Sequence, residues 1–236
     1  AEGRAAYQEA YDSYLEDQKY YNTYIEPSPI LSAMAGFDKL VNGIVEAVNN
    51  ILCPETTEVR ATPYTAEDGS EIQAETYTYN SVAQQTLYDR YGREVSGKDN
   101  GDGTYSFESG EKLYQSMGGA EVPVDSYTYS MIDMDKTGYG SDEDKTVGTE
   151  LFSRKGTDRY IKTTDDTGKT IYLRNNLNET GYESLYRLGN LQINPEAAQN
   201  VGKIPLSTVQ GKEDFDRAEE LVDVWDEKFA SLNPDT

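Results

Sequence analysis

Both ends of the chain carry apolar residues at alternating steps of three and four, the spacing of one face of an α-helix. Three such stripes are present, and we predict helices over them at residues 7–25, 30–52 and 215–232. The members of the stripes are Tyr7, Tyr11, Tyr14, Gln18, Tyr21 and Ile25; Ile30, Met34, Phe37, Val41, Ile44, Val48 and Ile51; and Phe215, Ala218, Val222, Trp225, Phe229 and Leu232.

Prolines separate these helices and end them. Pro27 and Pro29 interrupt the first stripe, because proline lacks a backbone N–H donor and restricts the residue before it. Ser28 is suited to cap the second helix, with Pro29 at its first position. The second stripe stops at Pro54 and the third at Pro234.

We expect the three helices to pack on one another as an antiparallel or mixed bundle. Asp214 and Asp216, near the start of the third helix, favour the positive end of its dipole. Two interpretations of the stripes stay open: an ordinary helical core, or a segment of a longer coiled-coil layer. The spacing does not separate them.

The middle of the chain has the alternation of β-strands. It is clearest in ETYTYNSVAQQTLYDRYG, GTYSFESGEKLYQSM, DSYTYSMIDM, RYIKTT and TIYLRN. Turn-forming residues lie between these segments at 67–69, 99–103 and 165–168. The last of these turns predicts a hairpin of RYIKTT with TIYLRN.

These patterns together predict an α+β fold. Residues 1–54 and 206–236 would form a helical rod-type domain, a bundle built from the two chain ends. Residues 55–205 would form an inserted, mainly antiparallel β domain. The chain would cross between the two parts near residues 54–58 and 203–212.

Composition removes several classes of function. The chain has 236 residues, with 43 acidic against 21 basic residues and a net charge of −22, which repels nucleic acids and anionic membranes. It has no histidine, which excludes Ser-His-Asp triads, Cys-His pairs and His-ligated zinc. One cysteine, Cys53, allows no internal disulfide and is most simply a small buried residue. No apolar run is long enough to span a bilayer.

The densest acidic segment partly fits a calcium-binding loop. Asp133, Asp135, Thr137, Gly138 and Asp144 match its first, third, fifth, sixth and twelfth positions. The twelfth position is Asp rather than the longer Glu, and the segment before the loop has the pattern of a strand. We therefore expect a solvated acidic loop and assign no metal ligand. Whether the loop from Asp133 to Asp144 binds calcium stays open.

We predict that the protein is not an enzyme. Paired carboxylates could serve a glycosidase, but 43 acidic residues make such pairs inevitable and unspecific. The glycines at 138–140 and 101–103 lack the third glycine and the following helix of a phosphate-binding loop. We accordingly assign no catalytic residue, no cofactor-binding residue and no cofactor.

Tyrosine is unusually frequent, with 20 residues in the chain. Tyrosines that cluster in the strands could form a stacking platform for sugars, or pack as one face of a half-buried sheet, which we favour. The clusters are Tyr77 with Tyr79, Tyr88 with Tyr91, and Tyr127 with Tyr129.

Three stretches, residues 28–54, 131–160 and 188–225, carry a family resemblance. They include AVNNIL at 47–52, followed late in the chain by LQINPEAAQ and DFDRAEELVDVW. In these segments the chain resembles the FlgK family of flagellar hook-associated proteins, which form the first hook–filament junction layer, in a form with an enlarged middle domain. Residues 55–124 carry no motif of that family.

The resemblance implies a non-enzymatic structural component of the bacterial flagellum that joins hook to filament. It implies an extracellular location after export without a cleaved signal peptide. The implied partners are neighbouring copies of the protein, the hook protein and the second junction protein, with no nucleic acid and no membrane. The family's polymerising terminal helices are not found in this stretch, so it resembles a central fragment, and we expect it to be monomeric in dilute solution.

An alternative from another class is an extracellular carbohydrate-binding or adhesive β module on a helical stalk. The tyrosine-rich strands motivate it. The sequence leaves open the strand order, the role of residues 55–124 and the residues that contact neighbouring subunits.

Overall fold

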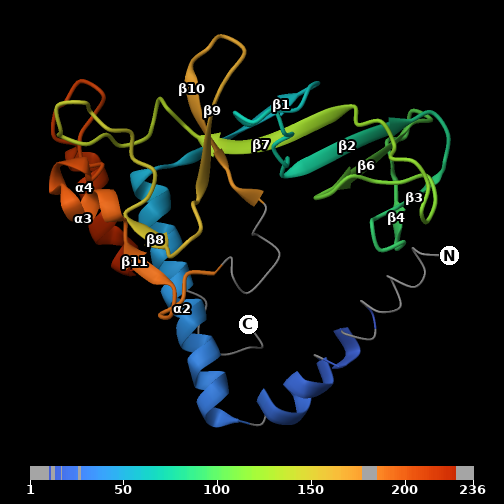
Figure 1. The fold of residues 1–236 in the computed structure, drawn as a ribbon, viewed down its shortest axis with the longest axis horizontal. Helices are drawn as coiled ribbons and strands as arrows, with labels where there is room; N and C mark the ends of the chain where they lie inside the picture. Colours follow the sequence, from blue (N-terminus) through green and yellow to red (C-terminus); the bar gives the residue numbers. More distant parts are fainter. Residues whose placement is uncertain (1–10, 12–13, 17, 26–27, 177–184, 227–236) are drawn as a thin grey trace. The chain divides into compact units, whose positions relative to one another are not determined.

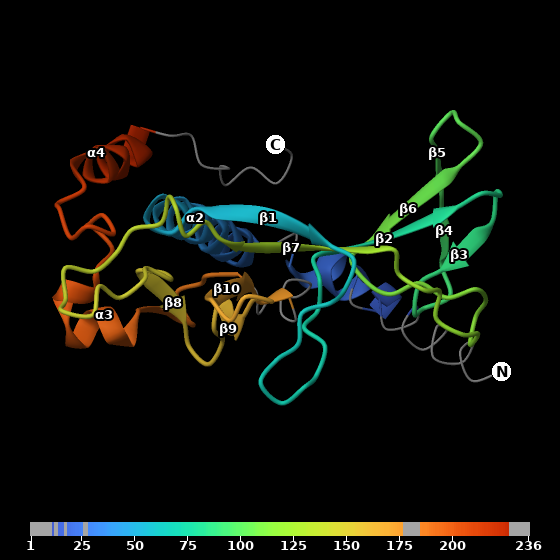
Figure 2. The same ribbon diagram turned by 90° about the horizontal axis from the view of Figure 1, so that it is seen from above.

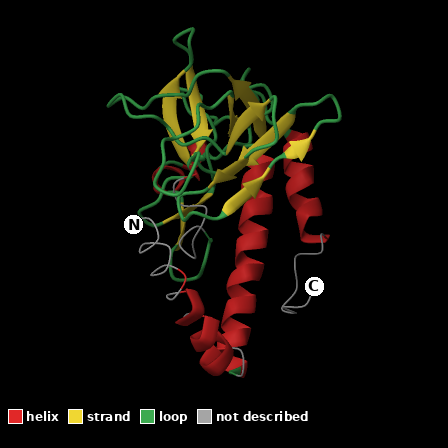
Figure 3. Cartoon of the chain, turned by 90° about the vertical axis from the view of Figure 1, so that its right-hand side faces the viewer, coloured by secondary structure: helices red, strands yellow, loops and turns green. Residues whose placement is uncertain are grey.

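The computed structural model describes residues 11, 14–16, 18–25, 28–176 and 185–226 (Figure 1). The chain divides into two compact units. Unit 1 comprises Ala1–Ser28 and Thr57–Tyr129, and unit 2 comprises Pro29–Thr56 and Ser130–Thr236. Figure 3 shows short strands joined by long loops, together with one long helix.

The long helix is α2, Pro29–Leu52, in unit 2. It begins at Pro29 and ends just before Cys53 and Pro54, which confirms the second predicted helix and its proline boundaries. The other helical elements of unit 2 are α3 (Pro195–Gln199), η4 (Val201–Lys203), α4 (Phe215–Asp223) and η5 (Val224–Asp226). Among the described residues, no helix combines the length and the apolar character needed to cross a membrane.

The strands of unit 1 form an antiparallel sheet in the order β5-β6-β2-β7 (Figure 2). These are β5 (Lys98–Asp99), β6 (Tyr105–Ser109), β2 (Thr76–Ser81) and β7 (Ser126–Ile132), and β1 (Glu55–Arg60) also pairs with β7. Tyr79 lies opposite Phe107 and Tyr77 opposite Tyr127. A separate two-stranded sheet joins β3 (Thr86–Tyr88) to β4 (Glu94–Ser96).

In unit 2 the end of β7 pairs with β10 (Thr170–Arg174), which pairs with β9 (Tyr160–Thr164). The β9–β10 pair is the predicted hairpin. Asp165 accepts hydrogen bonds from the backbone N–H groups of Thr167 and Lys169, and Gly168 takes the positive φ of 82° that the turn needs. A second small sheet pairs β8 (Phe152–Arg154) with β11 (Leu191–Ile193).

Tyrosines form much of the core of unit 1, and their hydroxyls bond to the backbone. The Tyr79 hydroxyl accepts from the N–H of Leu113 at 2.8 Å, and the Tyr77 hydroxyl accepts from the N–H of Ala74 at 3.2 Å. The Tyr129 hydroxyl donates to the carbonyl of Ile72 at 3.1 Å. These side chains therefore supply partners that buried loop backbone would otherwise lack.

The apolar core of unit 2 gathers at the C-terminal half of α2. Val48 and Leu52 of α2 pack with Val224 of η5. Leu151, Phe152 and Leu221 surround this cluster, which joins α2 to the start of β8 and to α4.

The predicted helical bundle is wrong, because the protein is mostly antiparallel β-sheet. The N-terminal half of the α2 stripe is uncovered, with Ile30 72% and Met34 59% exposed. The α4 stripe is also largely exposed, with Phe215 at 72%. Three-four spacing identifies side chains that share a face but does not say what covers that face. Here residues 151 and 152 and a short α4 cover part of it, in place of a second long helix.

The first predicted helix is described only in part. Residues 14–16 and 18–20 are helical and Tyr21–Ile25 is a π-helical turn, η1, with Tyr20 and Tyr24 exposed. Tyr7 of that helix lies outside the described residues, as do Phe229, Leu232 and the Pro234 terminus of the third.

The tyrosine core of unit 1 gives a first prediction. We expect Tyr79→Phe to lower the free energy of unfolding by about 1–3 kcal/mol, because the buried N–H of Leu113 loses its acceptor. Urea unfolding followed by tyrosine fluorescence measures this loss. Tyr88→Phe, at a half-buried position, is the matched control and should change stability by less. Equal effects of the two variants would contradict this account.

Candidate functional site: a buried polar cluster in unit 2

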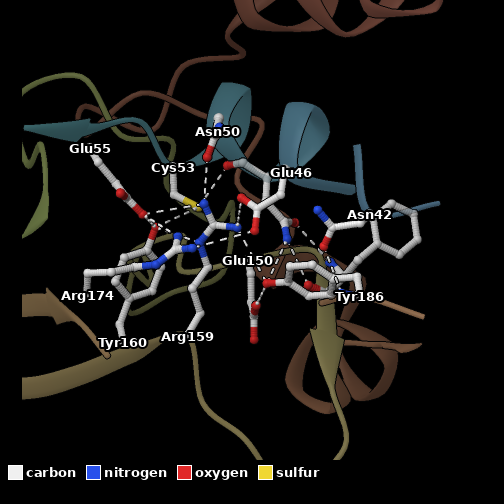
Figure 4. Close-up of polar contacts among 12 residues, drawn as sticks. Asn42, Glu46, Asn50, Cys53, Glu55, Glu150, Arg159, Tyr160, Arg174 and Tyr186 are labelled. Atoms are coloured by element: carbon white, nitrogen blue, oxygen red, sulfur yellow. Dashed lines mark hydrogen bonds and ion pairs between the residues drawn. The ribbon is translucent and has the colours of Figure 1, made fainter. Parts of the chain in front are cut away.

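A set of hydrogen-bonded polar side chains, many of them buried, lies beside the C-terminal half of α2 (Figure 4). We call it the Arg159 cluster. Its members come from α2, from residues 53–55, from β9 and β10, and from two loops. They are Asn42, Glu46, Asn49, Asn50, Cys53, Glu55, Glu150, Arg159, Tyr160, Arg174 and Tyr186.

The helix itself brings several of these residues together. Asn42, Glu46, Asn49 and Cys53 follow one another at steps of four, three and four, so they share one face of the helix. This polar stripe runs beside the apolar stripe that ends at Ile51. The apolar spacing predicted the helix but not this polar stripe, although the polar residues recur with the same periodicity.

Arg159 is the centre of the cluster. Its side chain is 1% exposed, and its guanidinium forms ion pairs with Glu46 at 2.9 Å and Glu55 at 3.4 Å. It also donates to Asn50 Oδ1 at 2.5 Å and to the hydroxyl of Tyr160 at 3.1 Å. A buried charge is tolerated only with such pairing and hydrogen bonding. Arg159 therefore joins the start of β9 to Glu46, which lies 113 positions earlier in the chain, and to Glu55, which lies 104 positions earlier.

Glu55 connects the two arginines of the cluster. Its carboxylate accepts from Arg174 at 2.9 Å and from the Tyr160 hydroxyl at 2.6 Å. Burial opposes ionisation of this carboxyl, but Arg174, the Tyr160 hydrogen bond and Arg159 together hold its pKa below the usual value. Glu55 is therefore charged at neutral pH.

Glu150 also belongs to the cluster, but its pKa is shifted in the opposite direction to that of Glu55. It accepts a hydrogen bond from the Tyr186 hydroxyl at 2.8 Å, while the Tyr186 backbone N–H donates to Asn42 on α2 at 2.8 Å. Burial raises the pKa of Glu150 to about 7, and the Tyr186 hydrogen bond and Arg159 offset only part of that effect. This carboxyl therefore changes its charge near neutral pH.

Asn49 and Cys53 satisfy backbone groups next to the charged residues. Asn49 Oδ1 accepts from the N–H groups of Leu151 and Phe152 at 3.0 and 3.1 Å, and its Nδ2 donates to the carbonyl of Phe152 at 2.9 Å. The Cys53 thiol donates to the carbonyl of Thr149 at 2.7 Å. Burial raises the pKa of Cys53 to about 12, so it stays a thiol and is a poor nucleophile. Its burial confirms the prediction made for this residue.

This arrangement acts as a clamp. Its donors and acceptors bond mainly to one another, and Arg159, Tyr160, Glu150 and Tyr186 are all buried, so they do not face a dissolved substrate. The cluster holds the C-terminal half of α2 against β9, β10 and residues 149–153. The chemistry that the geometry supports is rigid positioning of a helix.

The acidic loop uses its carboxylates within its own turns. Asp133 accepts from the backbone N–H of Asp135 at 3.1 Å and pairs with Lys136 at 3.2 Å. Asp142 accepts from the N–H of Thr146 at 2.9 Å. In the part of the chain that the structure describes, no three His, Cys, Asp or Glu side chains are grouped so that they could hold a metal ion.

The tyrosines that could have formed a sugar platform are not gathered in one groove. Tyr77, Tyr79 and Tyr129 are 4%, 1% and 1% exposed, respectively, within the core of unit 1. Tyr91 is exposed, but the guanidinium groups of Arg90 and Arg93 lie 5.0 and 5.3 Å from its ring centre. The interpretation favoured from the sequence was that the tyrosines pack on one face of a half-buried sheet. It fits Tyr77, Tyr79 and Tyr129.

Comparisons of the chain with protein-family models, with curated proteins and with solved structures found no match.

The first prediction from the cluster concerns Arg159. We expect Arg159→Met to lower the free energy of unfolding by about 3–5 kcal/mol, because Glu46 and Glu55 lose the buried cation that compensates them. Chemical denaturation measures the loss. Lys162→Met, which removes an exposed cation from the strand β9 that follows Arg159, is the control and should change stability by less than about 1 kcal/mol. A similar loss in both variants would contradict a central role for Arg159.

The second prediction concerns pH. Because the folded pKa of Glu150 is raised from 4.5 to about 7, the folded state binds this proton more tightly than the unfolded state does. The protein therefore loses stability from this group as the pH rises from about 4.5 to about 7. Glu150→Gln removes that loss, so the stability of the variant relative to the natural chain should increase over this window by roughly 2–3 kcal/mol.

Urea unfolding of the two proteins at pH 5 and at pH 7.5 tests this expectation. Glu143→Gln, at an exposed position, is the control and should show a difference that hardly changes with pH. A pH-independent difference between Glu150→Gln and the natural chain would show that Glu150 does not titrate as described.

Proposed function

We propose that this chain is a structural, non-enzymatic part of a flagellar hook-associated protein of the FlgK type, which joins hook to filament. The observation that carries the proposal is the form of α2. One end of this helix is clamped in unit 2, and the other end presents an uncovered apolar stripe.

The exposed half of α2 has the character of a contact surface. Ile30, Met34 and Phe37 lie on one face at helical spacing and are 72%, 59% and 45% exposed. Contiguous exposed apolar side chains favour interaction with another protein, because their transfer out of water is favourable. In a helical layer of an axial structure, such a face would pack on helices of neighbouring subunits.

The clamped half of α2 supports the same proposal. A subunit that transmits force between hook and filament requires a helix whose orientation is fixed by its own domain. The ion pairs of Arg159 with Glu46 and Glu55 hold α2 with side chains that resist rearrangement. Glu46 lies near the end of α2 opposite to the exposed stripe.

The partners of this proposal are neighbouring copies of the protein, the hook protein and the second junction protein, outside the cell. Repeated side-by-side contacts of this kind build a tubular assembly. The isolated chain is expected to be monomeric in dilute solution, and its export would use no cleaved signal peptide.

A carbohydrate-binding or adhesive β module is the second candidate, and it ranks lower. Tyr77 and Tyr79, which motivated it, are buried with their hydroxyls bonded to backbone N–H groups. They are not available to stack on a sugar ring.

Placing the protein on the flagellum tests the proposal. An epitope inserted between Gln84 and Gln85, in the exposed loop before β3, should leave the fold intact. Immunogold electron microscopy of purified flagella from the bacterium that carries the gene should then show one band between hook and filament. Labelling along the whole filament, or none on flagella that contain both hook and filament, would refute the assignment.

Substitutions on α2 test the contact surface. We expect Ile30→Glu combined with Phe37→Glu, in the full-length protein, to abolish filament attachment while circular dichroism stays unchanged, because charges replace exposed apolar contacts. Ala35→Glu, an exposed position outside the stripe, is the control and should leave filaments in place. Normal filaments in the double variant would contradict a contact role for this face.

A further inference from the structure

A cleft of about 1000 Å³ opens in unit 2, away from the exposed half of α2. Four segments line it: the C-terminal turns of α2, the loop at residues 135–139, the loop at 208–210, and α4 with η5. A cleft of this size is at the upper end of the range for ligand sites and has room for several residues of a peptide.

The floor of the cleft is apolar. Ala47 and Ile51 of α2, Tyr139 and Val224 contribute to its lining, and Val209 stands exposed at its edge. Tyr139 keeps its hydroxyl bonded to the carbonyl of Met134 at 3.0 Å, so its ring is held in place. Such a floor favours apolar side chains of a ligand.

The arginine in the cleft wall has its hydrogen bonds committed. Arg217 pairs with Asp214 at 3.1 Å and donates to the carbonyls of Ile51 and Lys136, which caps the end of α2. Lys136 pairs with Asp133 at 3.2 Å. The two cations of the cleft are therefore occupied, and the cleft is not suited to an anion.

The carboxylates at the rim, unlike these two cations, are available for pairing. Asp135 and Glu220 are exposed, and within the described residues neither carboxylate has a hydrogen bond or an ion pair. A cationic side chain that docks beside the apolar floor would therefore meet two unpaired negative charges.

We propose that this cleft binds a short basic, amphipathic peptide segment of another protein. Apolar side chains of the segment would lie on Ala47 and Ile51 and beside Val209, and a lysine or arginine would pair with Asp135 or Glu220. The exposed carboxylates at the rim identify this segment by its positive charge. The inference goes beyond the proposed function, since it names a different surface and identifies its partner by charge.

Binding of designed peptides to the whole chain tests this inference. The probe is a fluorescein-labelled twelve-residue peptide of leucine and lysine with helical amphipathic spacing. Fluorescence anisotropy should show saturable binding with one peptide per chain. Two counter-probes separate the contributions: the same pattern with glutamate for lysine, and the same pattern with serine for leucine. Each should bind at least tenfold more weakly, because each lacks one of the two contacts.

Matched variants place the binding in the cleft. We expect Asp135→Asn with Glu220→Gln to weaken binding of the leucine–lysine peptide about tenfold, as expected for the loss of two exposed ion pairs. Asp144→Asn with Glu219→Gln removes the same charge from exposed positions outside the cleft lining and should leave binding within about twofold. Ala47→Trp, which fills the floor, should also weaken binding.

Three results would overturn the inference. Equal weakening by the two double variants would show attraction to the overall charge rather than to the cleft. If the serine–lysine peptide bound as tightly as the leucine–lysine peptide, the apolar floor would have no role in binding. Absence of saturable binding by the leucine–lysine peptide would leave no peptide site at all.

Discussion

The buried guanidinium of Arg159 is the constraint on which unit 2 depends. A charge that is 1% exposed is costly unless carboxylates and hydroxyls meet it closely, so Glu46, Glu55, Asn50 and Tyr160 must converge on one point. That convergence fixes the last turns of α2, the start of β1 and strand β9 relative to one another. The apolar cluster of Val48, Leu52 and Val224 adds burial, but it has no comparable directional requirement.

The two units accommodate polar atoms in their cores by different interactions. The chain is only 36% hydrophobic and is rich in tyrosine, so each core has to contain polar atoms. Unit 1 places tyrosine rings inside and bonds their hydroxyls to loop backbone, as Tyr79 does with Leu113. Unit 2 gathers ion pairs around Arg159. A core held by directional bonds specifies one arrangement, and this suits a protein whose proposed role is mechanical.

The surfaces left uncovered carry the functional argument. The first half of α2 exposes an apolar stripe, while the cleft near the other end of the helix combines an apolar floor with two carboxylates that have no partner among the residues the structure describes. We propose that the first surface contacts helices of neighbouring subunits and that the second binds a basic segment of a different protein. One helix would then link the two proposed contact surfaces through the Arg159 cluster.

Local patterns in the sequence determined the elements that depend on neighbouring residues. The helix from Pro29 to Leu52 followed from its spacing and its prolines, and the β9–β10 hairpin followed from the turn at Asp165. The alternation in the strands also indicated that Tyr77 and Tyr79 share a face. What covers each face was decided by the tertiary structure, and so the bundle prediction failed: α2 is covered by residues around Leu151 rather than by a long helix. The same holds for Arg159, whose ion-pair partners Glu55 and Glu46 lie 104 and 113 positions away and leave no mark on its own segment. The physical reason is that periodicity is a property of the local backbone, whereas burial and ion pairing depend on segments that meet only after the chain has folded.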